Sequence, residues 1–480
     1  MPLAAVAASV PGSAVRGDAG VLVADAVLDA RHVVPGALFF CVPGRSADGH
    51  DFAGAALAAG AAALVVERWL DEEAPQVLVH AVRDAMGPMS ATVFGDPASS
   101  LTIAGVTGTN GKTTIVHLLE SVFAADGRRV GAIGTIGARI DGTPVTLERT
   151  TPEAPDLHRL LARMRDDGID AVAMEVSSHA LAQERVTGVR FDVAIFTNLS
   201  QDHLDYHGSM DAYFRAKAAL FAPDRADHAV LNVDDPWGRR LLGAGMPTTT
   251  YGLEPRADVR GTDVRVDVDG SRFHVDGREV RLRLRGSFNV SNGLAALAAA
   301  RVLDVDPDAA ITGIERLRDV PGRMEPVEAG QDFLVVVDYA HTPDSIRNVL
   351  AAARPLTTGR VIVVFGCGGD RDRAKRSPMG QAATEGADLT VVTNDNPRSE
   401  DPARIIAAIE RGAAQGGGRY VVEPDRRAAI RLALSEARSG DVVVVAGKGH
   451  ETVQEFADHA EPFDDRAVAR EELEALGARP

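Results

Sequence analysis

The chain has 480 residues, of which 45% are hydrophobic and 25% are charged, and this balance is typical of a globular protein. The length exceeds what one hydrophobic core supports, which predicts two or three domains. The formal net charge of -17 at pH 7 argues against a nucleic-acid-binding protein, because such proteins usually carry a basic face.

The number of cysteines and the lengths of the apolar stretches indicate in which cellular compartment the protein is expected. The only two cysteines, Cys41 and Cys367, lie far apart, which favours a reducing environment without a disulfide framework or a zinc ligand set. The longest uncharged stretches, of which the Ala/Gly-rich 52–66 is one, are too short to span a bilayer. Residues 1–15 contain no basic residue and make a poor signal peptide. We expect a cytoplasmic protein that binds neither a membrane nor nucleic acid.

Residues 1–99 predict a small α/β module. The apolar runs 36–42 and 63–66 have the character of buried strands, and 52–62 has the composition of a helix. The polar turn 43–49 follows the first run, at the position where loops of such sheets meet ligands, although an ordinary turn is the alternative.

The segment 105–114, Gly-Val-Thr-Gly-Thr-Asn-Gly-Lys-Thr-Thr, follows an apolar run and precedes a stretch with helical spacing. The order of strand, glycine-rich turn and helix is the context of a phosphate-binding loop, whose backbone N–H groups surround a polyphosphate. Lys112 supplies a cation, and the hydroxyl of Thr113 is placed to coordinate the Mg²⁺ that accompanies a nucleotide. An ordinary glycine-rich turn is the alternative.

Residues 100–325 show strands that alternate with helices, the pattern of a mainly parallel sheet covered on both faces. A charge-alternating stretch at 263–284 predicts a solvent-facing antiparallel addition. The predicted strands are 102–106, 130–133, 171–174, 193–197 and 229–233.

Residues 326–480 predict a third α/β domain. Its expected strands are 333–337, 361–365, 389–392 and 442–445, and polar loops follow three of them, at 366–373, 393–398 and 446–451.

These loops should meet at the carboxyl edge of the sheet. Arg371 and Arg398 would then bind anions, and Asp395 and Glu451 would accept an ammonium group. A site with both signs suits a zwitterion such as an amino acid. Solvated loops with surface salt bridges are the alternative.

Three further residues in the central domain are candidates for catalysis. Glu175 follows a buried strand near the phosphate-binding loop, where a carboxylate normally serves Mg²⁺. His203 is equally compatible with a metal ligand and with a structural hydrogen-bond partner. Lys217 lies on an apolar helical face, and local sequence predicts a buried stem with the amine in water.

Together, several segments of this sequence resemble the Mur ligases of peptidoglycan synthesis, from about Leu28 to Arg466. The segments are GVTGTNGKTT (105–114), MEVSSHAL (174–181), FTNLSQDHLDYH (196–207), FNVSN (288–292), PGRME (321–325), VVDYAHTPDS (336–345), FGCGGDRDR (365–373), DNPR (395–398) and AGKGHE (446–451).

The resemblance implies an α/β chain of three domains: a small N-terminal module, a central P-loop domain and a Rossmann-like C-terminal domain. It implies an ADP-forming ligase that adds diaminopimelate, with the meso isomer favoured, to UDP-N-acetylmuramoyl-L-alanyl-D-glutamate through an acyl phosphate. These small molecules and ATP would be its partners, and the expected state is a monomer.

The resemblance also assigns residues. The predicted catalytic residues are Lys112, Glu175, His203 and Lys217. The predicted magnesium ligands are Thr113, Glu175, His203 and a carbamylated Lys217. ATP would contact Gly108, Thr109, Asn110, Gly111, Lys112, Thr113, Thr114, Asn289, Arg323 and Asp338. The UDP-substrate would contact Leu28, Ala30, Arg45, Ser46, Ala47, Thr150, Thr151, Ser177, Gln183 and Arg185. The amino acid would contact Arg371, Asp395, Asn396, Pro397, Arg398, Gly447 and Glu451.

Two positions depart from the family pattern: Ala30 replaces a serine and Arg149 replaces an asparagine. The alternatives are a related ligase that joins glutamate to folate, which would not be expected to carry DNPR, and a P-loop ATPase of unrelated role, which explains only 105–114. A binding module without catalysis gives no reason for Glu175, His203 and Lys217 together.

Overall fold

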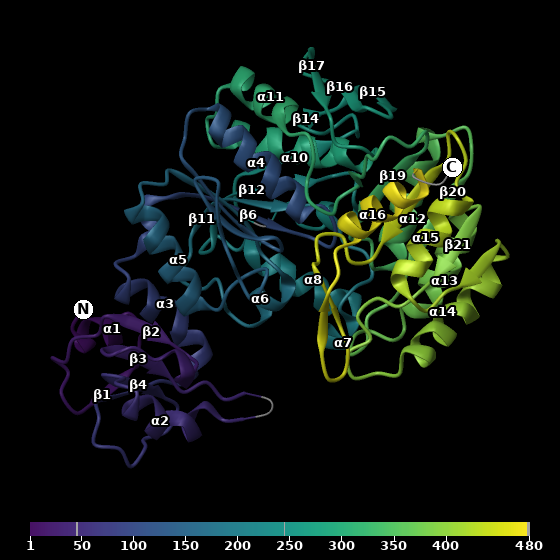
Figure 1. Cartoon of the computed structure of the whole chain (residues 1–480). Helices are drawn as coiled ribbons and strands as arrows, with labels where there is room; N and C mark the ends of the chain where they lie inside the picture. The colour runs from purple at the N-terminus through teal and green to yellow at the C-terminus, as the bar shows by residue number, and fades with distance from the viewer. Residues whose placement is uncertain (45–46, 244, 478–480) are drawn as a thin grey trace.

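The computed structural model describes residues 1–44, 47–243 and 245–477. Within these ranges, no helix combines the length and hydropathy that crossing a membrane requires. Three α/β domains follow one another along the chain, and the central one lies between the other two (Figure 1). This architecture agrees with the fold class that the sequence predicts.

The N-terminal domain is built on a five-stranded sheet in the order β1-β5-β4-β3-β2, with β2 to β5 parallel. Strands β3 and β4 are buried throughout, as their apolar runs predict. The predicted helix at 52–62 ends early, because Gly60 has a φ of 103° and turns the chain into β4. The elements are α1 (Leu3–Ala8), β1 (Ala14–Arg16), β2 (Asp25–Val27), η1 (Ala30–His32), β3 (Ala37–Phe40), η2 (Gly49–Phe52), α2 (Ala53–Ala58), β4 (Ala63–Val66), β5 (Gln76–Leu78), α3 (Val82–Val93) and η3 (Pro97–Ser100).

The central domain contains a nine-stranded sheet in the order β14-β13-β12-β11-β6-β10-β7-β8-β9, parallel except for β8 and β9. Apolar clusters cover both faces, which explains why its inner strands are continuous apolar runs. The first elements are β6 (Thr102–Thr107), α4 (Lys112–Ala125), β7 (Val130–Gly134), β8 (Gly137–Ile140), β9 (Thr143–Val145), α5 (Ala154–Asp166), β10 (Ala171–Glu175), α6 (Ser178–Ala182), β11 (Phe191–Phe196), α7 (Leu204–His207), α8 (Met210–Ala218), η4 (Ala219–Phe221), β12 (Ala226–Asn232), α9 (Pro236–Arg239), β13 (Thr248–Gly252) and β14 (Val259–Arg260).

The stretch predicted as an antiparallel addition is a three-stranded antiparallel sheet. It is not wholly solvent-facing, because alternate residues such as Phe273 and Val280 are buried in the same core as α4 and α10. Its strands and the two helices that follow are β15 (Thr262–Asp267), β16 (Gly270–Val275), β17 (Arg278–Leu282), α10 (Phe288–Val302) and α11 (Pro307–Arg316).

The C-terminal domain has a six-stranded sheet in the order β18-β19-β23-β20-β21-β22, in which only β18 is antiparallel to its neighbour. Its elements are β18 (Glu325–Pro326), β19 (Leu334–Asp338), α12 (Pro343–Ala353), η5 (Arg354–Leu356), β20 (Val361–Phe365), α13 (Arg376–Gly386), β21 (Leu389–Val392), α14 (Pro402–Gly416), β22 (Tyr420–Val422), α15 (Arg426–Glu436), β23 (Val442–Ala446), β24 (Val453–Glu455), β25 (Ala460–Pro462) and α16 (Asp465–Gly477).

One buried ion pair connects this domain's last helix to its sheet. The side chains of Arg426 on α15 and Asp465 on α16 are both fully buried, with 2.7 Å between Nη2 and Oδ2. Arg426 also donates hydrogen bonds to the carbonyl oxygens of Asn394 and Ala446, at the carboxyl ends of β21 and β23. The pair therefore stabilises the point where two of the predicted ligand loops begin.

Candidate active site

The glycine-rich segment connects β6 to α4 as predicted. Gly111 precedes the helix with a φ of 89°, a conformation that side chains rarely adopt. A Cβ atom on Gly108 would lie 1.8 Å from Thr197 Oγ1, so only glycine fits against β11 and the loop after it. The loop's backbone is thus held close to Thr197, and the N-terminus of α4 faces the space in front of the sheet.

The two lysines of the predicted catalytic set converge on one carbonyl oxygen. Lys112 Nζ donates to the carbonyl oxygens of Gly108 and Thr109 at 3.1 and 2.8 Å, and Lys217 Nζ donates to that of Gly108 at 2.6 Å. Lys217 is 2% exposed, so the expectation from local sequence that its amine reaches water is wrong. Burial and the charge of Lys112 hold the pKa of Lys217 well below its usual value, which favours a neutral amine.

Oxygen atoms suited to magnesium lie beside the phosphate-binding loop. Thr113 Oγ1 donates to Glu175 Oε1 at 2.9 Å, and the backbone N–H of Thr135 donates to the same carboxylate oxygen at 2.8 Å. Glu175 is 1% exposed, and hydroxyl and carboxylate oxygens are the donors that Mg²⁺ prefers. Thr113 and Glu175 therefore fit a magnesium ion, although no cluster of three or more His, Cys, Asp or Glu side chains suited to a metal occurs among the described residues.

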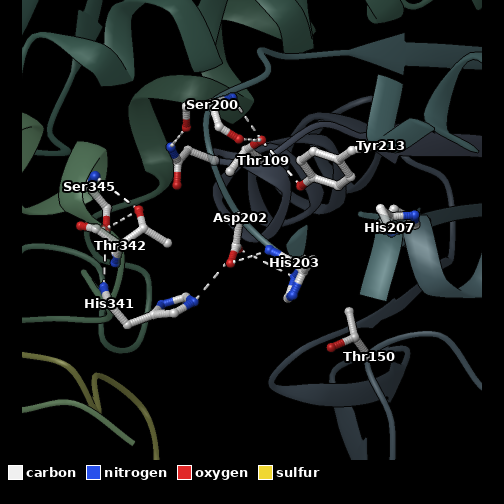
Figure 2. Close-up of polar contacts among 12 residues, drawn as sticks. Thr109, Thr150, Ser200, Asp202, His203, His207, Tyr213, His341, Thr342 and Ser345 are labelled. Atoms are coloured by element: carbon white, nitrogen blue, oxygen red, sulfur yellow. Dashed lines mark hydrogen bonds and ion pairs between the residues drawn. The ribbon is translucent and has the colours of Figure 1, made fainter. Parts of the chain in front are cut away.

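His203 lines the same cleft and is held by its neighbour Asp202 (Figure 2). His203 has a φ of 54°, and its Nε2 lies 3.3 Å from Asp202 Oδ2. Burial lowers the pKa of His203, so the imidazole is neutral at pH 7 and retains a nitrogen lone pair. A structural role and a ligand role are both compatible with this geometry.

Lys112, Thr113, Glu175 and His203 line one cleft of about 570 Å³ between the central and C-terminal domains, and Lys217 is not among the lining residues. The side of the central domain contributes the glycine-rich loop, Glu175 and His203, and the other side contributes the chain from Asp338 to Val349. Asn110 Nδ2 donates to Asp344 Oδ2 at 3.3 Å across the cleft. The predicted nucleotide site is therefore formed by two domains.

Of the three residues predicted to contact the nucleoside, Arg323 and Asp338 line the cleft, and Asn289 is buried next to a residue that lines it. Arg323 Nη2 donates to Thr113 Oγ1 at 2.9 Å. Asn289 is 1% exposed and accepts a hydrogen bond from Asn292, whose own side chain lines the cleft beside Gly111. Asn292, which was not predicted, lies in the same FNVSN segment of α10 as Asn289.

Most of the predicted UDP-substrate residues of the central domain form one hydrogen-bonded group. Thr151 Oγ1 donates to the carbonyl oxygen of Glu175 and accepts from the N–H of Ser177. Arg185 donates to the carbonyl oxygen of Thr151 and to Gln183 Oε1 at 3.2 and 2.7 Å. Thr150 joins this group through Thr135, because the two hydroxyl oxygens are 3.2 Å apart.

The remaining UDP-substrate residues belong to the N-terminal domain. Leu28 and Ala30 follow β2, and Ala47 lies in the loop after the neighbouring parallel strand β3, so these residues share an edge of the sheet. No hydrogen bond or ion pair joins them to the Thr151 group within the described ranges. Arg45 and Ser46 lie outside the described residues.

The predicted amino-acid residues come together at the carboxyl ends of β23, β20 and β21. A Cβ atom on Gly368 would lie 3.1 Å from Arg398 Nη1 and 3.7 Å from Arg371 Cγ, so both arginines lie against the first loop. A Cβ atom on Gly447 would lie 2.6 Å from Asp395 Oδ2.

The second and third loops are joined by side chains as well. Asn396 Nδ2 donates to Glu451 Oε2 at 2.8 Å, and burial raises the pKa of Glu451. Pro397 is buried, and its carbonyl oxygen lies so close to Gly369 that a Cβ there would meet it at 1.8 Å. The three loops thus form one polar site that holds both charge signs.

Sequence reasoning did not single out several residues that build these sites. His341, in the segment VVDYAHTPDS, lies opposite Asp202, with 4.0 Å between Nε2 and Oδ2 (Figure 2). Lys448 is fully buried and donates to Asn396 Oδ1 at 2.8 Å. Both lie inside segments that carry the family resemblance, but only a folded chain shows which side chains of a segment face a neighbour.

Fold and site together define a P-loop protein whose cleft lies between two domains, beside a cluster of polar loops that carries both charge signs. Three family models match the chain: the Mur ligase middle domain at 106–300, the Mur ligase glutamate ligase domain at 322–449 and the Mur ligase family catalytic domain at 27–92. The chain belongs to the Mur ligase family, as these matches and full-length relatives show.

Two such relatives are named UDP-N-acetylmuramoyl-L-alanyl-D-glutamate–2,6-diaminopimelate ligase. The protein of Geobacillus thermodenitrificans is 47% identical over 92% of this chain and 93% of its own length. The protein of Solibacter usitatus is 48% identical over 94% and 93%. A solved structure of a ligase with the same name is 36% identical, has a TM-score of 0.69 and covers 95% of this chain and 96% of that one.

A folylpolyglutamate synthase of Mycobacterium tuberculosis, solved with ADP and AMPPCP, is also similar. It is 20% identical with a TM-score of 0.64, and the match covers 83% of this chain and 95% of that chain. At this identity the likeness shows a shared fold alone.

Proposed function

We propose that this protein is an ATP-dependent, ADP-forming ligase that joins diaminopimelate to UDP-N-acetylmuramoyl-L-alanyl-D-glutamate in peptidoglycan precursor synthesis. Relatives of that name, 47 and 48% identical over nearly the whole chain, support the reaction. One structural observation carries the proposal: the nucleotide cleft and the amino-acid loops are neighbours.

Tyr339 lies between the cleft and the third of these loops. It lines the cleft, Arg323 lies over its ring at 4.7 Å, and the ring centroid of His450 is 5.1 Å from its own. His450 belongs to the loop that also carries Gly447 and Glu451. An amine bound at the loops therefore has a short route to a carboxylate activated in the cleft.

A carboxylate does not react directly with an amine, because its oxygen is a poor leaving group. Transfer of the ATP γ-phosphate to the carboxylate gives an acyl phosphate, from which phosphate can leave. Lys112 and the N–H groups of 108–114 would hold the phosphates and offset the negative charge during transfer. Thr113, Glu175 and His203 would hold Mg²⁺, which when bound supplies further positive charge at the phosphates. The neutral amine of diaminopimelate then attacks the acyl carbon, and phosphate leaves.

Lys217 is suited to the proposed carbamylation. Only a neutral amine combines with carbon dioxide, and its environment lowers the pKa of Lys217. The carbamate is an anion, so it would attract Lys112, whereas a protonated Lys217 would repel it. This change of sign supports a role for the modified lysine in holding the cations of the site.

Arg398 is the proposed selector of diaminopimelate. Its guanidinium can bind the distal carboxylate through paired hydrogen bonds, and lysine lacks that carboxylate. Asp395 and Glu451 would receive an ammonium group. The Thr151 group, with Arg185, would receive the UDP-substrate from the side of the N-terminal domain.

The proposal includes a monomeric cytoplasmic enzyme with domain boundaries after residues 99 and 325. The sheets support the first boundary, because β5 and β6 belong to different sheets. The C-terminal sheet begins with β18 at Glu325, one residue before the second proposed boundary. The order of the domains matches a division into UDP-substrate, nucleotide and amino-acid binding.

The test is ADP release measured with ATP, the UDP-dipeptide, and diaminopimelate or lysine in turn. We expect ADP only when both the UDP-dipeptide and diaminopimelate are present. ADP release with neither would indicate an unrelated P-loop ATPase, and turnover with folate and glutamate would indicate the folate ligase. Equal turnover with lysine would remove the selectivity.

A further inference from the structure

Arg398 already has a carboxylate partner within the chain. Its Nε lies 2.6 Å from Glu455 Oε2, and its backbone N–H donates to the carbonyl oxygen of Glu455 at 3.1 Å. Nη1 donates to the carbonyl oxygen of Gly369 at 3.0 Å. The side chains of Arg398 and Glu455 are 23 and 43% exposed, so the pair is partly open to solvent beside the amino-acid loops.

Buried polar contacts determine the position of Glu455. It ends β24, which forms a hairpin with β25 over residues 453–462. Lys448 Nζ donates both to Asn396 Oδ1 and to the carbonyl oxygen of Val453. Asn396 Oδ1 also accepts the backbone N–H of Glu455 at 3.1 Å.

A second contact fixes the same strand. Gln454 is 6% exposed, and its Nε2 donates to the carbonyl oxygen of Asp395 at 2.7 Å. The hairpin is therefore attached to the loop 395–398 on both sides of its strand. These contacts place the backbone of Glu455 beside Arg398, so the ion pair does not depend on the flexibility of the two side chains alone.

The pair leaves part of the guanidinium available. Arginine has five N–H donors, of which one hydrogen of Nη1 is donated to Gly369, while Nε faces Glu455 in an ion pair. Nη2 has no hydrogen-bond partner among the described residues. An incoming carboxylate can thus reach the outer edge of Arg398 while Glu455 remains on Nε.

We propose that Glu455 is a specificity-determining residue, which weakens the preference of Arg398 for an amino acid with a distal carboxylate. The inference rests on the proposed function. Glu455 neutralises part of the charge of Arg398 and repels a second carboxylate on the same guanidinium. It also keeps Arg398 paired when an amino acid without that carboxylate occupies the site, which lowers the penalty that would exclude lysine.

The test is Glu455→Gln, which preserves an oxygen acceptor for Nε and removes the charge. We expect the KM for diaminopimelate to fall about threefold or more, with kcat and the KM values for ATP and the UDP-dipeptide unchanged. The ratio of kcat/KM for diaminopimelate to that for lysine should rise by at least the same factor.

Glu461→Gln is the matched control, because Glu461 lies on β25 opposite Gln454 and is exposed. It removes one carboxylate from the same hairpin, and we expect no change in any constant.

An unchanged or higher KM for diaminopimelate in Glu455→Gln would overturn the role of Glu455 while leaving the proposed function intact. If the unaltered enzyme does not use diaminopimelate at all, the proposed function fails and the inference fails with it.

Discussion

Two cations that share one acceptor are an unusual arrangement at the scale of single residues. Lys112 and Lys217 both donate to the carbonyl oxygen of Gly108. Burial alone penalises the charged form of each amine, and their proximity adds repulsion. A neutral Lys217 relieves both costs.

Replacing Lys217 by alanine should lower kcat by about 100-fold or more, because the proposed carbamate supplies a charge that no neighbouring group replaces. Short carboxylic acids such as formate should restore part of the activity by entering the space left by the side chain. ADP release measures both effects. Arg215→Ala on the same helix is the control, since Arg215 is exposed and should retain full activity. Near-normal turnover of Lys217→Ala would show that the carbamate idea is wrong.

The same lysine should make stability depend on pH. The unfolded chain protonates Lys217 below the usual pKa near 10.5, whereas the folded chain holds the amine neutral to a lower pH. Between the lowered pKa of the folded chain and 10.5, the unfolded state binds more protons than the folded state, so the cost of burying Lys217 decreases as the pH rises towards 10.

In buffer free of carbon dioxide, we expect Lys217→Met to unfold at a higher temperature than the unaltered protein at pH 7. The difference should shrink at higher pH, and thermal unfolding followed by circular dichroism at several pH values measures it. A difference that is constant with pH would contradict the proposed protonation.

Close helix packing is the feature of interest at the scale of elements. Helices α13 and α14 approach so closely that a Cβ atom on Gly412 would lie 1.7 Å from the carbonyl oxygen of Ser377. A Cβ atom on Gly380 would meet the carbonyl oxygen of Ile409 at 2.1 Å. The two helices cover the strands that carry the amino-acid loops.

Gly412→Ala should therefore destabilise the protein by about 1–3 kcal/mol, because backbone must move to admit the methyl group. Chemical denaturation followed by fluorescence or circular dichroism measures the loss. Gly54→Ala in α2 is the matched control, since its new Cβ would meet only the end of the Glu72 side chain at 3.6 Å. Equal stability of the two variants would refute the packing argument.

Sequence predicted the elements that are defined by their own composition. The buried strands β6, β10, β20, β21 and β23 are apolar runs that end in polar loops, and each was predicted to within a residue or two. The short strands β8, β9, β13, β14, β24 and β25 were not predicted, because their hydrogen bonds depend on a neighbouring strand rather than on local composition.

The candidate site shows the same division. The glycine-rich turn, Glu175 and the charged loops were visible as motifs at strand ends. The burial of Lys217, the position of Asn292 in front of Asn289 and the pairing of Arg398 with Glu455 arise from contacts between distant segments. Such contacts have no local signature.

At the scale of the whole molecule, a carboxylate connects the N-terminal domain to the proposed UDP-substrate site. Glu153 Oε2 accepts from Arg83 on α3 at 2.8 Å, and its Oε1 lies 3.0 Å from Arg185 Nε. Glu153 is 7% exposed, so the two arginines are held across the boundary between domains by a nearly buried charge.

Glu153→Ala should raise the KM for the UDP-dipeptide several-fold, because it removes the carboxylate partner of Arg185 and loosens the N-terminal domain. The KM for ATP should not change, since Lys112 and Thr113 are untouched. Initial rates with each substrate varied in turn measure this. Glu148→Ala, at a nearby exposed position, should behave as the unaltered enzyme does. A parallel rise in both KM values would indicate general unfolding instead.

The buried pair of Arg426 and Asp465 has a consequence for the order in which the chain acquires its structure during synthesis. The residues of β20, β21 and β23 leave the ribosome before residue 465, so for a time Arg426 lacks its buried ion-pair partner Asp465, and enclosing it without that partner would cost several kcal/mol. The sheet's ligand-bearing rim should therefore stay open on the nascent chain and close only when the last helix arrives.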